Sequence, residues 1–196
     1  MISVYCVNWG TKYPREFVDT LKASVQEHLT VPHKFICYTD NPVEEYDIPV
    51  KYPYLRGVWH KLALLENHGD SLFFDLDIKI NSNIDFLCED FDKFSVLDSA
   101  PWKGQKDDAV FRMTQNTMVN SSVMRWSDHA HIFEKFQQHR DMYLRLYSGI
   151  DRFIYNEEVD YHYIQTNKIT SWLQNLDNSA IVLYNGKYNE IQSANN

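Results

Sequence analysis

Residues 57–80, GVWHKLALLENHGDSLFFDLDIKI, carry the strongest fold signal in this sequence. Apolar residues recur in its first half at helical spacing and predict a short helix with one apolar face: Val58, Leu62 and Leu65. Gly69 is predicted as the C′ residue of this helix, in a His68-Gly69-Asp70 turn. Leu72-Phe73-Phe74 is apolar without alternation, which is typical of a strand buried on both faces. The stretch therefore predicts a helix, a turn and a strand of an α/β sheet.

Two aspartates, Asp75 and Asp77, follow the predicted strand directly. Side chains at positions i and i+2 of an extended chain lie on the same face, so the two carboxylates repel each other unless a cation lies between them. No residue next to them in the sequence neutralises both. Such oxygen ligands suit Mg²⁺ or Mn²⁺ rather than zinc, and open α/β sheets place ligands at the carboxyl ends of strands. The apolar run before the aspartates and Lys61 upstream of them favour a functional site over two acids in a solvated loop.

The length and composition narrow the classes of protein to which this chain can belong. The 196 residues suffice for one domain with a substantial core. The net charge of −8, from 27 acidic and 19 basic residues, argues against a general binder of nucleic acid or of anionic membranes, since either needs a basic surface. Three widely spaced cysteines predict reduced thiols. No signal-peptide pattern or membrane-length apolar stretch is present, so we expect no membrane span and a cytoplasmic location.

The first forty residues predict a parallel strand pair. Ile2–Val7 and His33–Tyr38 have the apolar character of strands, and between them lies a helical pattern that Pro14 opens at its first position. The order strand, helix, strand predicts a right-handed crossover. Only Gly10 follows the first strand, so the G-x-G-x-x-G pattern of a dinucleotide-binding Rossmann site is absent.

The rest of the chain predicts further short elements. Residues 43–56 predict an irregular link with room for one short strand, residues 101–114 a polar loop, and residues 191–196 a frayed end. The remaining patterns predict helices at 127–140 and 151–155 and strands at 94–98, 159–164 and 180–184.

The order of these elements resembles the GT-A glycosyltransferases, most closely the glycogenin and lipopolysaccharide galactosyltransferase group (glycosyltransferase family eight). The specific part of the resemblance is His60-Lys61-Leu62 leading to FFDLD at residues 73–77. Shorter and more degenerate matches follow the family's order: VNWGTKYPREFVDTLKASVQEHL (7–29), FSVLDSA (94–100), VNSSVM (119–124), IDRFIYN (150–156) and IVLYNGK (181–187). The resemblance implies a mostly parallel central sheet flanked by helices. It also implies a single domain over 1–196, with a nucleotide-binding half in 1–100 and an acceptor and sugar half in 101–196.

The resemblance implies a metal-assisted donor site. Asp75 and Asp77 would hold Mn²⁺ or Mg²⁺ against the donor diphosphate, with Asp75 also near the ribose. Lys61 would lie by the phosphates or the donor sugar as part of the catalytic set. A divalent ion and a lysine together stabilise the negative charge of a departing nucleoside diphosphate. The alternative for Lys61 is a solvated helix lysine.

The resemblance also assigns residues to the two ends of the donor: Asn8, Tyr13 and Asp40 on the nucleotide side, and Asn120, Ser121 and Asp151 on the sugar side. Asn120 and Asp151 would hold sugar hydroxyls and belong to the catalytic set. Structural alternatives exist: surface packing for Tyr13, a turn or polar strand face for residues 120–122, and a helix N-cap for Asp151.

Two positions depart from the family pattern. Leu183 stands where the family has a metal-binding His three places before Gly, so the third metal ligand is open, with Asn185 as the nearest polar substitute. Arg152 stands where the family has a Gln tied to a retaining mechanism. Retention and inversion are therefore both open, with an acid of the 157–160 segment as the base if the enzyme inverts.

The leading functional hypothesis is a metal-dependent glycosyltransferase. It would move a hexose from a nucleotide sugar, expected to be a UDP-sugar, to a hydroxyl acceptor on a glycan, a protein or a small molecule. The alternative is a phosphohydrolase of the haloacid-dehalogenase type, in which the first Asp of FFDLD is a nucleophile. A third hypothesis is a carbohydrate-binding protein that has kept the fold without catalysis.

Overall fold

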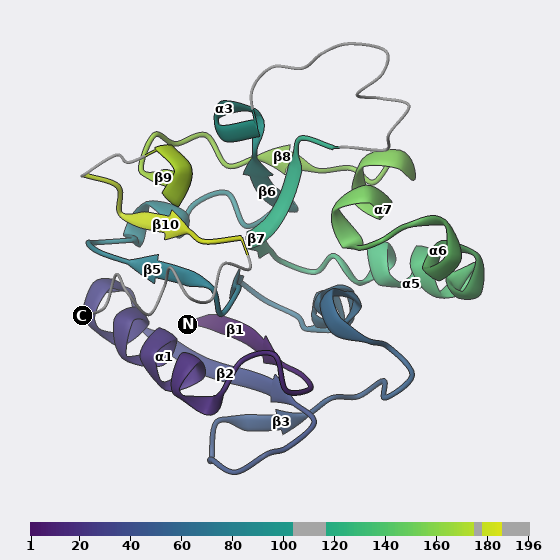
Figure 1. Cartoon of the computed structure of the whole chain (residues 1–196), viewed down its shortest axis with the longest axis horizontal. Helices are drawn as coiled ribbons and strands as arrows, with labels where there is room; N and C mark the ends of the chain where they lie inside the picture. The colour runs from purple at the N-terminus through teal and green to yellow at the C-terminus, as the bar shows by residue number, and fades with distance from the viewer. Residues whose placement is uncertain (104–116, 175–177, 186–196) are drawn as a thin grey trace.

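The computed structural model describes residues 1–103, 117–174 and 178–185. Within these residues a seven-stranded sheet has the order β3-β2-β1-β4-β7-β6-β8 (Figure 1). β7 runs antiparallel to both of its neighbours, β4 and β6, and the other pairs are parallel. The strand bounds are β1 Ile2–Asn8, β2 His33–Thr39, β3 Asp47–Pro49, β4 Ser71–Phe74, β6 Ser95–Asp98, β7 Val119–Trp126 and β8 His162–Tyr163. The predicted mostly parallel sheet and the parallel pair of the first two strands are confirmed.

A smaller sheet follows the acidic pair. Its strands, in the order β5-β10-β9, are β5 Ile78–Ile80, β10 Ile181–Leu183 and β9 Ile169–Ser171. β10 is antiparallel to β5 and parallel to β9. The chain therefore passes from the large sheet into the small one through Asp75 and Asp77.

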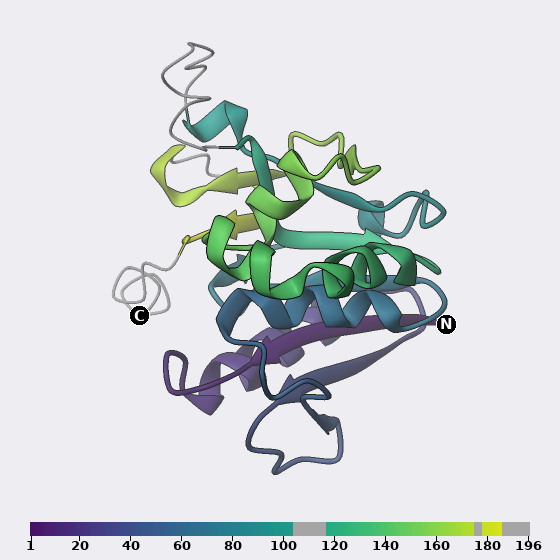
Figure 2. The same cartoon turned by 90° about the vertical axis from the view of Figure 1, so that its right-hand side faces the viewer.

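Helices cover both faces of the large sheet. Figure 2 shows α2 and α5 to α7 in front of the strands, while α1 lies behind them. The helix bounds are α1 Arg15–His28, α2 His60–Ala63, α3 Ala100–Lys103, α5 Ala130–Gln138, α6 Arg140–Leu146 and α7 Ile150–Asn156. Single 3₁₀ turns at Gly57–Trp59 and Leu64–Glu66 flank α2, and two more lie at Asp85–Leu87 and Trp172–Gln174.

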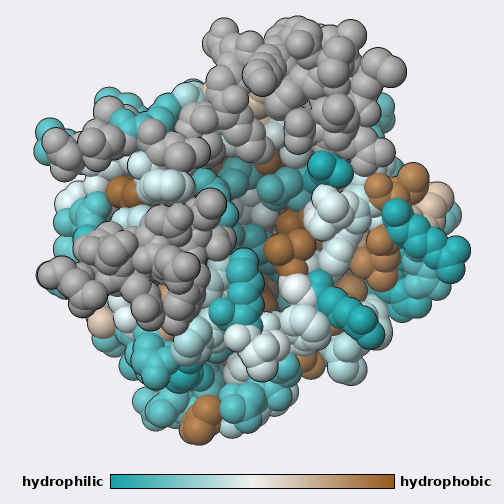
Figure 3. Space-filling view, viewed as in Figure 1, coloured by the Kyte–Doolittle hydropathy of each residue, from teal (hydrophilic) through white to brown (hydrophobic). Residues whose placement is uncertain are grey.

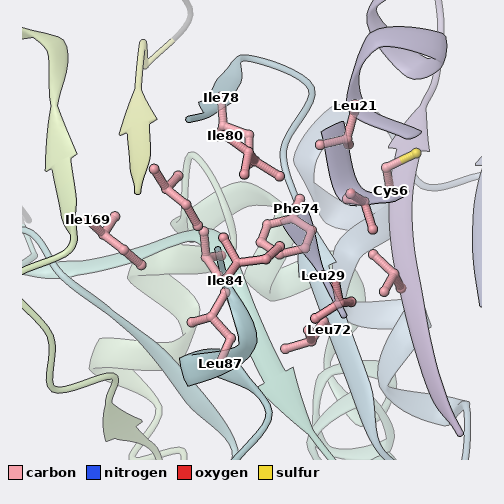
Figure 4. Close-up of a cluster of buried hydrophobic side chains, with 14 of the residues drawn as sticks. Cys6, Leu21, Leu29, Leu72, Phe74, Ile78, Ile80, Ile84, Leu87 and Ile169 are labelled. Atoms are coloured by element: carbon pink, nitrogen blue, oxygen red, sulfur yellow. The ribbon is translucent and has the colours of Figure 1, made fainter. Parts of the chain in front are cut away.

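The two faces of the sheet bury two apolar clusters. One cluster packs α1 and the smaller sheet against one face, through residues such as Leu21, Phe74 and Ile80 (Figure 4). The other packs α2, α5 and α7 against the opposite face around Phe73 and Trp126. All four residues of β4 are buried, as its unalternating apolar run predicts, because both faces are covered.

Several predicted boundaries were wrong. Pro14 precedes α1 as its N-cap, with ψ of 160°, and is not the first helical residue. Gly69 is not the C′ residue, because the helical segment ends at Glu66; its φ of +83° instead supplies the turn into β4. The helix predicted over 127–140 is split, since His139 at φ −132° separates α5 from α6. These breaks arise from backbone angles that the apolar spacing does not encode.

Some other segments differ from what the sequence predicted, and some predicted segments lie outside the described residues. Residues 100–103 form α3 although a polar loop was predicted from 101, and β9 had no predicted counterpart. The predictions for 104–114 and 191–196 lie outside the described residues. Cys6, Cys37 and Cys88 are free thiols, as predicted.

The surface is mixed in polarity. On the face drawn in Figure 3, hydrophobic residues lie in separate spots among hydrophilic ones. The helices found in the described part of the chain are all too short or too polar to cross a membrane.

Candidate functional site

One edge of the large sheet gathers the polar strand ends. β1, β2, β4 and β6 point the same way, so Asn8, Asp40, Asp75 and Asp98 all lie at or just beyond that edge. β7 runs in the opposite direction and therefore starts there, which brings the 120–122 segment to the same place. A cavity of about 490 Å³ opens at this edge.

Lys61 and Asp75 form a buried ion pair at the centre of the cavity. The Lys61 ammonium lies 2.7 Å from Oδ1 and 2.8 Å from Oδ2 of Asp75. It also donates to the carbonyl and the hydroxyl oxygen of Ser121, both at 3.3 Å. The turn after α2 folds the chain back on itself and places Lys61 beside the end of β4. Lys61 is thus not a solvated helix lysine.

This ion pair corrects one sequence-based expectation. The sequence showed no neighbouring residue that neutralises the two aspartates, but Asp75 has a counter-charge in Lys61, fourteen positions upstream. Burial nevertheless raises the pKa of Asp75; Lys61 acts against that rise and the charge of Asp77 adds to it. Because Asp77 disfavours a second negative charge nearby, the pair attracts a further cation.

Asp77 is buried and tied to the first loop. The Tyr13 hydroxyl donates to Asp77 Oδ2 at 3.0 Å, and the Asp77 carbonyl accepts from the Tyr184 N–H at 3.0 Å. Burial raises the pKa of Tyr13, and the charges of Asp77 and Asp75 raise it further. Tyr13 is therefore a neutral donor that orients the Asp77 carboxylate, not a loosely packed surface residue.

The side chains of the cavity fit a hard divalent ion if a bound phosphate group supplies part of its coordination shell. Within the described residues no group of three or more His, Cys, Asp or Glu side chains is arranged for a metal ion. Asp75 and Asp77 offer carboxylate oxygens, which suit Mg²⁺ or Mn²⁺ when a phosphate supplies further oxygens. Leu183 is fully buried in the apolar core, whereas Asn185 lines the cavity, with its amide nitrogen 3.3 Å from Ser171 Oγ.

Ser121 and Asp151 form the far wall of the cavity. Asp151 Oδ1 accepts from the Ser121 N–H at 3.0 Å, which ties the start of α7 to β7. Both residues line the cavity. Asn120 does not: its side chain is buried, and its Oδ1 accepts from the Ser122 N–H at 3.0 Å. Asn120 therefore stabilises the backbone of the 120–122 segment and does not face the cavity.

The predicted nucleotide residues are only partly brought together. Tyr13 lines the cavity, but Asn8 and Asp40 do not. The Asp40 carboxylate accepts from the Gly10 N–H at 3.1 and 3.2 Å and so fixes the loop after β1. Asn8 Oδ1 is buried without a hydrogen-bond partner among the described residues.

Sequence reasoning missed several residues that line the cavity. Trp9 stands on its near wall, with its ring centroid 5.5 Å from that of His60. Lys12 lies on the same wall, and residues 148–150 lie on the far wall together with Arg152, which the sequence marked only as a departure from the family pattern. Trp9 and Lys12 directly follow the predicted first strand, and that position could have marked them as cavity residues.

The solved structures to which this chain is similar include glycosyltransferases. The chain is similar to the galactosyltransferase LgtC, solved in complex with donor and acceptor sugar analogs, with a TM-score of 0.61, 10% identity and coverage of 98% of this chain and 95% of that one. It is similar to a glycosyltransferase involved in glycosylation of the major capsid of PBCV-1, with a TM-score of 0.63, 12% identity and coverage of 99% and 98%. For the glycosyltransferase GlyE of Streptococcus pneumoniae TIGR4 the TM-score is 0.62 at 12% identity, over 84% of this chain and 46% of that one.

No protein-family model and no curated protein matches the sequence. At identities of 10–12% the structural likeness shows the fold alone. It confirms the predicted GT-A fold and does not favour the haloacid-dehalogenase alternative.

Proposed function

We propose that this chain is a metal-dependent glycosyltransferase that transfers a hexose from a UDP-sugar to a hydroxyl acceptor. One observation carries the proposal: Asp75 and Asp77 lie at the carboxyl end of β4 in a cavity that Lys61 also lines. The diphosphate of a nucleotide sugar is negatively charged and needs cationic partners. This arrangement combines the fixed ammonium of Lys61 with two carboxylates that attract a metal ion.

The cavity has walls suited to the two ends of a nucleotide sugar. Trp9 and Tyr13 offer rings on the near wall, where a base can stack. Ser121 and Asp151 offer a hydroxyl and a carboxylate on the far wall, where sugar hydroxyls can bind. Because the two walls come from different halves of the chain, we propose that residues 1–196 act as one unit, with the nucleotide on residues 1–100 and the sugar on residues 101–196.

A metal ion would be held by Asp75, Asp77 and the donor diphosphate, with the Asn185 amide oxygen as a further ligand. When bound, such an ion stabilises the negative charge of the departing nucleoside diphosphate. Lys61 holds Asp75 in place and offers its ammonium to the same charge. Tyr13 orients the Asp77 carboxylate, since its hydroxyl donates to Oδ2.

We favour retention of the anomeric configuration. An inverting mechanism needs a carboxylate base beside the acceptor. Glu157, Glu158 and Asp160 do not line the cavity. Asp151 does, but one of its oxygens already accepts from the Ser121 N–H.

The proposal is tested by the thermal stability of the protein with a panel of nucleotide sugars, each with and without Mn²⁺. A ligand that binds only the folded state raises the free energy of unfolding by about 2.7 kcal/mol at a hundredfold excess over Kd. We expect UDP-sugars with Mn²⁺ to stabilise the chain, and other nucleotide sugars to do so less. Transfer is then assayed with the stabilising donor on hydroxyl acceptors. No stabilisation by any nucleotide sugar would refute the proposal.

A further inference from the structure

Arg152 is a cation on the far wall of the cavity. It belongs to α7, directly after Asp151, and its side chain is half-buried. Of the described basic residues that line the cavity, Lys12 follows β1 and Lys61 pairs with Asp75 at the end of β4, whereas Arg152 belongs to α7, which packs on β7 on the other side of β4.

The Arg152 guanidinium makes no hydrogen bond or ion pair with any described residue. The side chain of Asn156 reaches only the backbone of Arg152, whose carbonyl accepts from Asn156 Nδ2 at 2.7 Å. Lys61, by contrast, donates to Asp75 and Ser121. The neighbouring Asp151 carboxylate is held by the Ser121 N–H.

A half-buried guanidinium that lines the cavity and has no partner among the described residues is free to bind a ligand group there. Neutral hydroxyls are already served on this wall by Ser121 and Asp151. A guanidinium presents a planar fork of N–H donors that matches an oxyanion in two parallel hydrogen bonds. The diphosphate of the donor would lie at the centre of the cavity, beside Lys61 and the aspartates, so the oxyanion at the far wall is a different one.

We propose that Arg152 is a specificity-determining residue that binds a carboxylate on the transferred sugar, so that the donor is a UDP-uronic acid. This inference rests on the proposed function, because it assumes that the nucleotide lies against the near wall. It deepens that function by naming the class of sugar.

UDP-glucuronic acid and UDP-glucose differ only in the group at C6, so they isolate the carboxylate. Calorimetry measures the Kd of both, and of UDP alone, in the presence of Mn²⁺. The wild-type chain is expected to bind UDP-glucuronic acid at least about tenfold more tightly than UDP-glucose, in line with a charge-assisted hydrogen-bond pair. UDP-galacturonic acid and UDP-galactose form a second matched pair for the C4 epimer.

Three variants locate the effect. Arg152→Gln should bring the ratio of the two affinities close to one and leave the Kd of UDP unchanged. Arg152→Lys should keep part of the preference, because it keeps the charge and loses the fork. Arg145→Gln, which removes an exposed arginine of α6 outside the cavity, should keep the wild-type ratio. Unfolding curves for each variant check that it folds.

Two results overturn the inference while the proposed function stands. One is equal binding of the acidic and neutral sugars by the wild-type chain. The other is an Arg152→Gln variant that weakens UDP itself as much as UDP-glucuronic acid, which would place the guanidinium on the diphosphate. If UDP does not bind in any form, the proposed function fails and the inference fails with it.

Discussion

The Lys61 ammonium lies within hydrogen-bond distance of both carboxylate oxygens of Asp75, at 2.7 and 2.8 Å. The Lys61 side chain is 7% exposed and that of Asp75 is 22% exposed, so water screens the pair only partly. Removing one partner of such a pair leaves the other charge desolvated and uncompensated.

Lys61→Ala should therefore lower the free energy of unfolding by about 2–3 kcal/mol, a value reduced for the partial exposure of Asp75. The double variant Lys61→Ala with Asp75→Asn should recover much of that loss, because no charge is then left alone. Urea unfolding of both single variants and the double variant gives the coupling energy.

Lys51→Ala is the matched control, since Lys51 forms an ion pair of the same length with Glu66 at an exposed site. It should cost clearly less stability than Lys61→Ala. Equal losses in the two variants, or strict additivity in the double variant, would contradict the role given to the buried pair.

Tyr13→Phe should weaken Mn²⁺ binding in the presence of UDP by about tenfold, because it removes the hydroxyl that orients Asp77. Calorimetric titration of Mn²⁺ into the UDP-saturated protein measures this. Tyr46→Phe is the control: its hydroxyl also donates to an aspartate, Asp19 at 2.7 Å, but neither residue lines the cavity. The role of Tyr13 is wrong if both variants bind Mn²⁺ alike.

Asp47→Asn should destabilise the fold by about 2–3 kcal/mol, since Asp47 accepts from Arg15 at 2.7 Å and from two backbone N–H groups and joins α1 to β3. Burial alone would raise the pKa of Asp47, but these hydrogen bonds outweigh it and lower the pKa. The stabilisation is thus present above the usual Asp pKa and is lost as pH falls through the depressed value. Unfolding at pH 7 and pH 3 should show a smaller difference between variant and wild type at pH 3.

His129 should make stability depend on pH near neutrality. Its Nε2 accepts from the Phe94 N–H at 3.1 Å, and burial lowers its pKa. The unfolded chain therefore binds the proton at higher pH than the folded chain, and the free energy of unfolding falls as pH drops below about 6.5. Burial lowers the pKa of His60 as well, so His129→Gln should reduce this slope without abolishing it.

The exposed neighbour His131 provides the comparison for that slope. The charge of His131 contributes to the lowered pKa of His129 less than burial does, so His131→Gln should reduce the slope between pH 7 and pH 5 less than His129→Gln does. An unchanged slope in His129→Gln would show that His129 is not held neutral by the fold.

The sequence predicted the centre of the site better than its walls. An apolar run ending in Asp75 and Asp77 is a local pattern, so both the buried strand and its acidic end could be recognised. Lys61 could be associated with that end because only a helix and a turn separate them. The reversed strand β7 and the order of the sheet bring Arg152 and Trp9 to the same cavity, and no spacing in the sequence encodes that arrangement.

The smaller sheet was missed in part for a related reason. β5, β9 and β10 have three residues each, which is too short for a periodic pattern, and β5 pairs with a strand about a hundred residues further along the sequence, as in Ile80 with Ile181. The split between α5 and α6 at His139 occurs without Gly or Pro to mark it. Asn120 shows that a polar residue beside a site can serve the backbone instead, since its side chain fixes the Ser122 N–H.

Calorimetry of UDP binding, with and without Mn²⁺, tests most directly whether Asp75 and Asp77 hold a metal ion together with a nucleoside diphosphate. We predict that Mn²⁺ tightens UDP binding by at least about tenfold and that UDP tightens Mn²⁺ binding by the same factor, because the coupling is reciprocal. Asp77→Asn should abolish this coupling in a folded protein. UDP affinity that does not change with Mn²⁺, or coupling that survives in Asp77→Asn, would contradict the proposed site.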